Sequence, residues 1–231
     1  MKTIEINKQS YFFNASNFSE SLFDINYLQE NNLITGSSVG RGTTWFFLYE
    51  HKKYVLRHYY RGGLIGKMNP DNFLYTGLTN TRAYQEFQLL NQMAKLGLPV
   101  PLPYAGRISR YGMFYKADLI IELIEDAQDL VAVLNQQAIN EKQWYEIGRV
   151  IRLFHDQNIY HSDMNSHNIM LDQNDKVWLI DFDKCAQRES GAWKEQTLAR
   201  LLRSFRKEKT INNQLNWHED NWSTLMLGYQ G

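Results

Sequence analysis

One stretch of the sequence constrains the chain more than any other: residues 160–171 followed by residues 177–183. Asp163 and Asn168 are five positions apart, and two short apolar runs separated by a polar turn then lead to Asp181. The runs predict paired strands, which would return Asp181 to the neighbourhood of Asn168. Phosphoryl transfer requires a carboxylate that accepts a hydroxyl proton and oxygen ligands for Mg²⁺. We therefore interpret Asp163 as a catalytic base and Asn168 and Asp181 as magnesium ligands.

The same stretch also has an interpretation without chemistry. Asp, Asn and Ser are ordinary turn residues, and two apolar strands joined by a polar turn can form a plain hairpin. The whole pattern is more specific than any of its parts, so we favour the catalytic interpretation. We expect His161 to brace the loop backbone. For His167, a contact with phosphate or substrate and a packing role are equally open.

The composition bounds the class of protein. With 231 residues the chain can form one large domain or two small lobes, and 43% hydrophobic residues are typical of a globular protein. Because 25 basic residues balance 25 acidic ones, no overall field attracts nucleic acid, and we expect no nucleic-acid partner. The single cysteine, Cys185, excludes an internal disulfide framework and fits a reducing compartment; we expect it to be a small buried residue rather than a reactive thiol.

The sequence shows no targeting or membrane-spanning segment. No apolar run approaches the roughly 20 residues that a membrane span needs, and the first residues lack the apolar core of a signal peptide. We expect a cytoplasmic protein that could still rest on a membrane surface.

A glycine-rich stretch lies upstream, with Gly36, Gly40 and Gly42 before the apolar run Trp45 to Tyr49. Glycines allow the backbone to approach phosphate oxygens closely, so that successive N–H groups can bind them. A flexible hairpin turn is the default interpretation of such a stretch. Its place between strands and upstream of Asp163 favours a nucleotide-binding loop.

Two charged residues predict a phosphate-contacting pair. Arg57 ends the strand Tyr54 to Arg57, and Glu86 lies on a helix predicted from Thr81 to Leu96. We expect Arg57 to contact nucleotide phosphates and Glu86 to pair with it. The alternatives are an arginine and a glutamate exposed to water. Arg61 is a second candidate for the phosphate contact.

The middle of the chain predicts a hinge between two lobes. Strands are expected near residues 105–109 and 114–123, and Glu122 and Leu123 would offer their backbone to an adenine edge. This assignment follows only from their order along the chain. We place the lobes at residues 1–124 and 125–231.

Helices dominate the predicted second lobe. A capping-box pattern at residues 140–143 opens a helix to Asn158, and a terminal helix is expected to pack through Trp222, Leu225 and Leu227. Between them, a basic amphipathic segment carries Arg200, Arg203 and Arg206. Its arginine face is either a solvated helix surface or a surface for anionic lipid headgroups or a phosphorylated substrate.

The motifs together resemble the protein-kinase-like fold in its small-molecule branch, and within it the 3-deoxy-D-manno-octulosonic acid (Kdo) kinases of lipopolysaccharide core synthesis. The arginine strand with its double glycine points to this family. The residues that carry the resemblance are Val39 to Thr44, Val55 to Gly63, His161 to Ile169, Trp178 to Lys184 and Leu198 to Ser204.

The resemblance implies an α+β, bilobal fold: an N-terminal antiparallel-sheet lobe with one long helix and a mainly helical C-terminal lobe. It implies transfer of the γ-phosphate of ATP, with Mg²⁺, to a Kdo hydroxyl, thought to be O4. The acceptor would be a Kdo-containing lipid A precursor at the cytoplasmic face of the inner membrane, on whose anionic surface the enzyme would be peripheral. Asp163 would be the base, Asn168 and Asp181 the metal ligands, and Arg57 the phosphate-contacting cation.

The sequence departs from the protein-kinase pattern in four places. His-Ser-Asp replaces His-Arg-Asp, Asp-Phe-Asp replaces Asp-Phe-Gly, Arg57 replaces the strand lysine, and no Ala-Pro-Glu follows. These departures argue against protein substrates. Two alternatives stay open: a kinase of another acceptor, such as a core heptose or an aminoglycoside, and a nucleotide-binding pseudokinase that serves as a scaffold.

Overall fold

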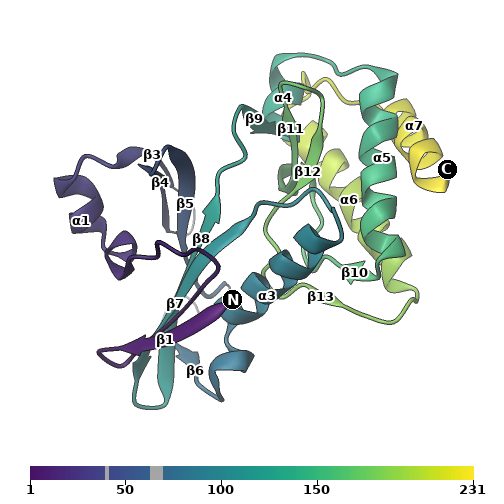
Figure 1. Cartoon of the computed structure of the whole chain (residues 1–231). Helices are drawn as coiled ribbons and strands as arrows, with labels where there is room; N and C mark the ends of the chain where they lie inside the picture. The colour runs from purple at the N-terminus through teal and green to yellow at the C-terminus, as the bar shows by residue number, and fades with distance from the viewer. Residues whose placement is uncertain (40–41, 63–69) are drawn as a thin grey trace. The chain divides into compact units, whose positions relative to one another are not determined.

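The structure is a computed structural model that describes residues 1–39, 42–62 and 70–231. Its described residues form two compact units. The first comprises Met1–Asn91 and Leu102–Leu123, and the second comprises Gln92–Pro101 and Ile124–Gly231. The segment with prolines at 99, 101 and 103 is thus divided between the units. Figure 1 labels the helices and strands of each unit along the chain.

An antiparallel sheet forms the body of the first unit. Its strand order is β1-β2-β7-β8-β5-β4-β3, and β6 pairs with β8. The strands are β1 (Lys2–Ile6), β2 (Gln9–Phe13), β3 (Ile34–Val39), β4 (Thr43–Tyr49), β5 (Lys52–His58), β6 (Phe73–Leu74), β7 (Pro103–Tyr111) and β8 (Phe114–Glu122). Two helices accompany them, α1 (Ile25–Glu30) and α3 (Arg82–Lys95). The strands predicted at residues 45–49, 54–57, 105–109 and 114–123 are confirmed.

Alternation along β2 divides the core of this unit between the two faces of the sheet. Tyr11 and Phe13 belong to an aromatic cluster with Phe23 and Leu28, next to α1. Phe12 points the other way and packs edge-to-face on Phe87 of α3, 5.1 Å between ring centroids. Successive side chains of a strand face opposite sides, so three adjacent aromatic residues serve two cores. One of these cores fixes α3 against the sheet and thereby places Glu86.

The second unit is mainly helical, with α4 (Leu130–Gln136), α5 (Glu141–Asp156), α6 (Trp193–Ile211) and α7 (Glu219–Gln230). Its short strands are β9 (Ala127–Asp129), β10 (Ile159–Tyr160), β11 (Ile169–Asp172), β12 (Val177–Leu179) and β13 (Ala186–Gln187). They form a three-stranded sheet in the order β12-β11-β9 and a separate β10-β13 pair. The mixed α+β fold, with an antiparallel-sheet part and a helical part, is the one predicted from sequence. Within the described ranges, no helix is long and apolar enough to cross a bilayer.

Helix α5 is the centre of this unit's core. Asn140 caps it in the predicted capping box, accepting from the Gln143 N–H at 2.9 Å while the Gln143 side chain accepts from the Asn140 N–H. Trp144 packs edge-to-face on Phe205 of α6, and Phe154 stacks on Phe182. Because Phe182 follows Asp181 directly, the core fixes the backbone on which the predicted metal ligand sits.

Helices α5 and α7 approach each other so closely that glycine is required at their contact (Figure 1). A Cβ on Gly148 would lie 1.8 Å from the Leu225 carbonyl oxygen, and a Cβ on Gly228 would lie 1.9 Å from the Tyr145 carbonyl oxygen. The prediction that α7 packs through Leu225 is confirmed, because that side chain is fully buried. The prediction for Leu227 is wrong: it is 61% exposed, since Gly228 occupies the position facing α5.

We expect Gly148→Ala to destabilise the second unit by about 1–3 kcal/mol, because the new methyl group would force two helix backbones apart. Alanine has a higher helix propensity than glycine, which by itself would stabilise α5. A loss of stability would therefore come from the packing of α5 against α7. Gly191→Ala is the control: its Cβ would meet only Trp193 Cδ1 at 3.7 Å, and the expected change is within about 0.5 kcal/mol. Urea unfolding followed by circular dichroism measures both. Equal stability of the two variants would contradict the close approach.

Candidate active site

The predicted catalytic loop runs from β10 through a short 3₁₀ helix, Ser166–Asn168, into β11. His161 is buried, and both of its ring nitrogens are used by the loop backbone. Nε2 donates to the Ile180 carbonyl oxygen at 3.0 Å, and Nδ1 accepts the Asp163 N–H at 3.3 Å. Burial lowers the pKa of the His161 imidazole, so the ring stays neutral at neutral pH. A neutral ring with both nitrogens bonded supports the backbone and has no proton-transfer role.

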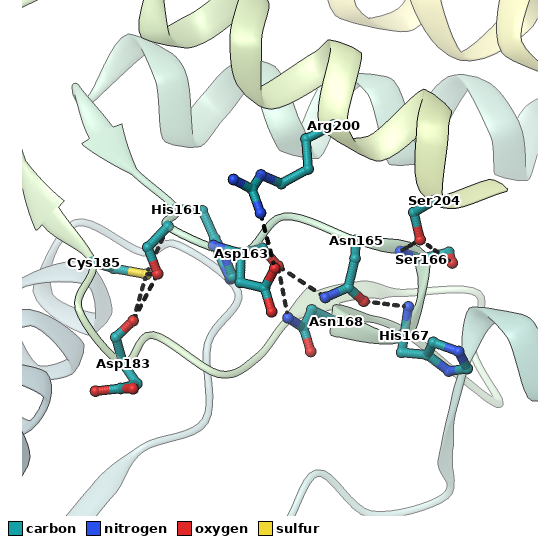
Figure 2. Close-up of polar contacts among 11 residues, drawn as sticks. His161, Asp163, Asn165, Ser166, His167, Asn168, Asp183, Cys185, Arg200 and Ser204 are labelled. Atoms are coloured by element: carbon teal, nitrogen blue, oxygen red, sulfur yellow. Dashed lines mark hydrogen bonds and ion pairs between the residues drawn. The ribbon is translucent and has the colours of Figure 1, made fainter. Parts of the chain in front are cut away.

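A hydrogen bond to the Asp163 backbone orients the Asn168 side chain. Its Nδ2 donates to the Asp163 carbonyl oxygen at 2.9 Å, and Asn165 Nδ2 donates to the same oxygen at 3.0 Å. Figure 2 shows these two amides around the Asp163 backbone. With the nitrogen engaged, the Asn168 Oδ1 has no partner among the described residues and is the atom that a cation could bind. An amide oxygen is a ligand that Mg²⁺ accepts.

The return strand brings the backbone just before Asp181 next to the Asn168 backbone. The Ile180 N–H donates to the Asn168 carbonyl oxygen at 3.0 Å, so the residue before Asp181 is bonded directly to Asn168. Strands β11 and β12 are antiparallel, with Ile169 opposite Leu179, as predicted. Asp181 itself has φ +63, a left-handed conformation that is uncommon for residues other than glycine and often found at functional sites.

The carboxylates of Asp163 and Asp181 both act on the buried ring of His161. The carboxylates of Asp163 and Asp181 both favour the protonated form of His161, although burial outweighs them. Asn168 and Asp181 supply one amide and one carboxylate oxygen, which fits Mg²⁺ bound through few protein ligands and completed by phosphate oxygens. Within the ranges that the structure describes, no group of three or more His, Cys, Asp or Glu side chains could hold a metal ion.

The segment after Asp181 is bonded back to the loop. Ser162 Oγ donates to the Asp183 carbonyl oxygen at 2.8 Å, and the Ser162 N–H donates to Cys185 Sγ at 3.2 Å. Cys185 is buried, as predicted. These bonds tie together the two halves of the motif, which are separated by the β11–β12 hairpin.

Sequence reasoning missed the contact of helix α6 with this loop. Arg200 Nη1 lies 3.3 Å from Asp163 Oδ1, and Ser204 Oγ lies 2.8 Å from Ser166 Oγ. Glu208 Oε1 lies 3.6 Å from His167 Nε2. Because residues four apart share one face of a helix, Arg200, Ser204 and Glu208 all project toward the loop, where they contact Asp163, Ser166 and His167 in turn. The four-residue spacing was visible in the sequence, but nothing local showed which surface it would meet.

The predicted Arg57–Glu86 pair is present in the first unit. Arg57 Nη1 lies 3.0 Å from Glu86 Oε1, and the Tyr59 hydroxyl donates to the other carboxylate oxygen. The Glu86 side chain is 1% exposed, so the alternative of a solvated surface glutamate is wrong. Burial and the adjacent Glu86 charge raise the pKa of Tyr59 well above its usual value, which keeps the hydroxyl a donor. Sequence reasoning did not identify Tyr59.

The described residues of the glycine-rich stretch belong to, or lie next to, the antiparallel strands β3 and β4. Gly36 lies within β3, at a register shift between Ile34 and Gly36. Gly42 precedes β4, and a Cβ there would lie 1.9 Å from the Tyr60 ring, so a larger residue would have to displace that side chain. Gly40, the third predicted nucleotide-binding glycine, lies outside the described residues.

The predicted hinge residues end the sheet of the first unit. The Glu122 N–H donates to the Leu102 carbonyl oxygen at 2.8 Å, and the Leu123 N–H donates to the Lys53 carbonyl oxygen at 2.9 Å. Neither N–H therefore remains to bond an adenine ring, and a contact with adenine would have to come through their carbonyl oxygens. Arg61 Nε donates to the Asn72 carbonyl oxygen at 2.6 Å, whereas Arg57 pairs with Glu86.

Comparison with known proteins agrees with this geometry. A family model described as lipopolysaccharide kinase (Kdo/WaaP) family matches residues 26–229. Among similar proteins, the 3-deoxy-D-manno-octulosonic acid kinase of Vibrio parahaemolyticus is 46% identical over 207 residues, which cover 90% of this chain and 87% of the relative. The proteins of the same name from Photobacterium profundum and Haemophilus influenzae (strain PittEE) are each 42% identical, with coverage of 98% or more of both chains. The resemblance predicted from the motifs is confirmed, and the chain belongs to the lipopolysaccharide kinase (Kdo/WaaP) family.

Proposed function

We propose that the protein is an ATP-dependent kinase that phosphorylates a Kdo hydroxyl, O4, on a Kdo-containing lipid A precursor in lipopolysaccharide synthesis. The relatives' names support the sugar, and the family supports the reaction class. The observation that supports the chemistry best is the arrangement of Asn168. Its side-chain nitrogen donates to the Asp163 carbonyl oxygen, and its backbone carbonyl oxygen accepts from the Ile180 N–H. The base, one metal ligand and the residue before the other metal ligand are thus joined by hydrogen bonds.

Each residue of the second unit has a distinct task in this proposal. Asp163 accepts the proton of the acceptor hydroxyl as the hydroxyl oxygen bonds to the γ-phosphorus of ATP, while the bond from that phosphorus to the β-phosphate oxygen breaks and ADP leaves. Asn168 Oδ1 and the Asp181 carboxylate hold Mg²⁺, which supplies charge neutralisation to the phosphates when bound. His161 stays neutral and keeps Asp163 and Ile180 in place through its two ring nitrogens.

The first unit supplies nucleotide contacts in this proposal. Arg57 binds phosphate oxygens, with Glu86 and Tyr59 fixing its orientation from the buried side. Its side chain is 23% exposed, so the guanidinium keeps contact with solvent and with a ligand. The glycines at 36, 40 and 42 allow close approach to the phosphates. The carbonyl oxygens of Glu122 and Leu123 would accept from the adenine amino group.

We expect Asp163→Asn to lower turnover by about 10²–10⁴-fold, because the amide cannot accept the hydroxyl proton. Asp181→Ala should abolish turnover, because Mg²⁺ loses a carboxylate ligand. Asp156→Asn is the matched control: Asp156 is also an exposed aspartate paired with an arginine, Arg152, at 2.6 Å, but it lies on α5. Phosphorylated glycolipid is measured by mass spectrometry, and folding by circular dichroism. Turnover close to wild type in either site variant would end the assignment.

The acceptor is tested by competition among three classes of compound. With ATP and Mg²⁺, we expect phosphorylation of a Kdo-lipid A precursor and little of a heptosylated core or an aminoglycoside. Nuclear magnetic resonance of the product should place the phosphate on O4. Preference for a heptose or an aminoglycoside would establish the second kinase reading. Binding of Mg²⁺-ATP without transfer to any of the three acceptors would favour the pseudokinase scaffold, an alternative suggested by Arg57 and the basic helix.

We also infer peripheral association with an anionic membrane surface, through a surface other than the arginine face of α6. Two arginines of the α6 face have carboxylate partners: Arg200 contacts Asp163, and Arg206 is bidentate with Glu219 at 2.8 and 2.9 Å. In the first unit, by contrast, the β7–β8 turn and adjacent β6 expose large apolar side chains next to Arg110. They are Leu74, Tyr111, Met113 and Phe114. Exposed apolar and aromatic residues next to cations fit a lipid interface.

Vesicle co-sedimentation distinguishes the two surfaces. We expect Tyr111→Ser/Met113→Ser to weaken binding to vesicles of anionic lipid by roughly tenfold or more, because apolar contact with the bilayer is lost. Arg203→Gln/Lys207→Gln should weaken it only slightly and only at low salt. Ile211→Ser/Leu227→Ser is the control, since it removes two exposed apolar side chains of the second unit. Unchanged binding of the Tyr111/Met113 variant would contradict this surface.

A further inference from the structure

Arg200 lies in the catalytic region, but the mechanism above gives it no role. It lies on α6, 37 positions from Asp163 in the sequence, yet its Nη1 contacts the Asp163 carboxylate. Among the described residues, no other side chain bonds to that carboxylate. The two side chains are 50% and 55% exposed. An exposed pair of this kind contributes little to folding stability, so stability does not explain its place beside the expected base.

The position of Arg200 is fixed by its neighbours on the helix. Leu198 and Leu201 are buried on either side of it in the sequence. One turn further on, Ser204 Oγ accepts the Ser166 N–H at 3.1 Å and shares a second hydrogen bond with Ser166 Oγ. The helix is thus anchored to the catalytic loop at the same face from which Arg200 projects. Figure 2 shows Arg200 and Ser204 reaching from α6 to the loop.

The guanidinium of Arg200 has unused donors. Only Nη1 is engaged, so Nε and Nη2, an edge that fits a carboxylate with two parallel hydrogen bonds, have no partner in the described part of the chain. Arg206, two turns along, is the contrast: its Nε and Nη2 are both bonded to Glu219. Arg200 therefore presents an open, solvent-accessible fork beside the catalytic carboxylate, whereas Arg206 does not.

The geometry of transfer indicates which ligand this fork would meet. In an in-line displacement the attacking oxygen lies between the base and phosphorus, so the acceptor sugar contacts Asp163. The metal ligand Asn168 lies on one side of Asp163, and Arg200 approaches from the α6 side (Figure 2). Because the acceptor must contact Asp163, we expect a cation in contact with the Asp163 carboxylate to lie within reach of the acceptor. The relatives are named for an octulosonic acid, a sugar that carries a carboxylate.

We propose that Arg200 binds the carboxylate of the acceptor sugar acid and selects acidic over neutral sugars. The proposal rests on the proposed function and extends it to the acceptor. Nε and Nη2 donate to the two carboxylate oxygens, while Nη1 keeps its contact with Asp163. One guanidinium then holds base and acceptor together, so that the hydroxyl to be phosphorylated lies next to the group that takes its proton.

The test compares the wild type and two Arg200 variants on two forms of the acceptor. The Kdo-lipid A precursor is compared with its methyl ester, which has the same hydroxyls but no carboxylate charge. We expect wild-type kcat/KM to fall about 10- to 100-fold on the ester. Arg200→Gln should show that loss on the acid already, discriminate less than about threefold between acid and ester, and leave the KM for ATP unchanged. Arg200→Lys should recover part of the discrimination, because lysine keeps the charge but loses the fork.

Arg149→Gln is the matched control, since Arg149 is equally exposed and paired with Glu146, but on α5; it should discriminate like the wild type. If Arg200→Gln lost turnover altogether, its affinities for the acid and the ester would be measured without ATP. The ratio of the two affinities would then be compared with that of the wild type. Equal discrimination by Arg200→Gln and wild type would overturn the assignment, because Arg200 would then act on Asp163 or on the phosphates. An inactive wild type on both acceptors would instead contradict the proposed function itself.

Discussion

The hydrogen bond from the Ile180 N–H to the Asn168 carbonyl oxygen, at 3.0 Å, is the constraint on which the candidate site depends. It continues the β11–β12 pairing beyond the end of β12, and it places Asp181 directly beside Asn168. The Ile180 carbonyl oxygen then accepts from His161, which in turn accepts the Asp163 N–H. The backbone of one residue thereby connects both expected metal ligands and the expected base. These hydrogen bonds hold the backbone of the three residues in one arrangement, and a site for phosphoryl transfer needs such a rigid support.

Charge is treated differently in the two units. In the first unit, Glu86 is buried and its carboxylate oxygens are both used, one by Arg57 and one by Tyr59. Burying a carboxylate is costly unless it is paired and hydrogen-bonded, and Arg57 and Tyr59 supply these bonds to Glu86. The buried Glu86 in turn holds the Arg57 side chain in place. In the second unit, Asp163 and Arg200 are half-exposed and incompletely paired. Their open donors and acceptors are available to a substrate, which is the property expected of groups that change partners during a reaction.

Local sequence patterns predicted most of the elements that position the site. The hairpin before Asp181, helix α5 with its capping box, and helix α3 with Glu86 each depend on spacing within a few residues, and the structure contains all three. Errors came where the relevant contact is long-range. Leu227 was predicted to pack, but the close approach of α5 and α7 uses Gly228 instead. Strand β9 and helix α4 were not predicted, because β9 exists only through its pairing with β11.

The sequence by itself determined the reaction class, because Asp163, Asn168 and Asp181 occur at spacings that a hairpin brings together. It also determined the family, since the motifs cover most of the chain. Only the tertiary structure decided that Arg200 belongs beside Asp163 and Tyr59 beside Glu86. The physical reason is that strand and helix periodicity are encoded in neighbouring residues. The surface that a helix such as α6 meets is instead decided by packing among segments far apart in the chain, and a single sequence does not specify that packing locally.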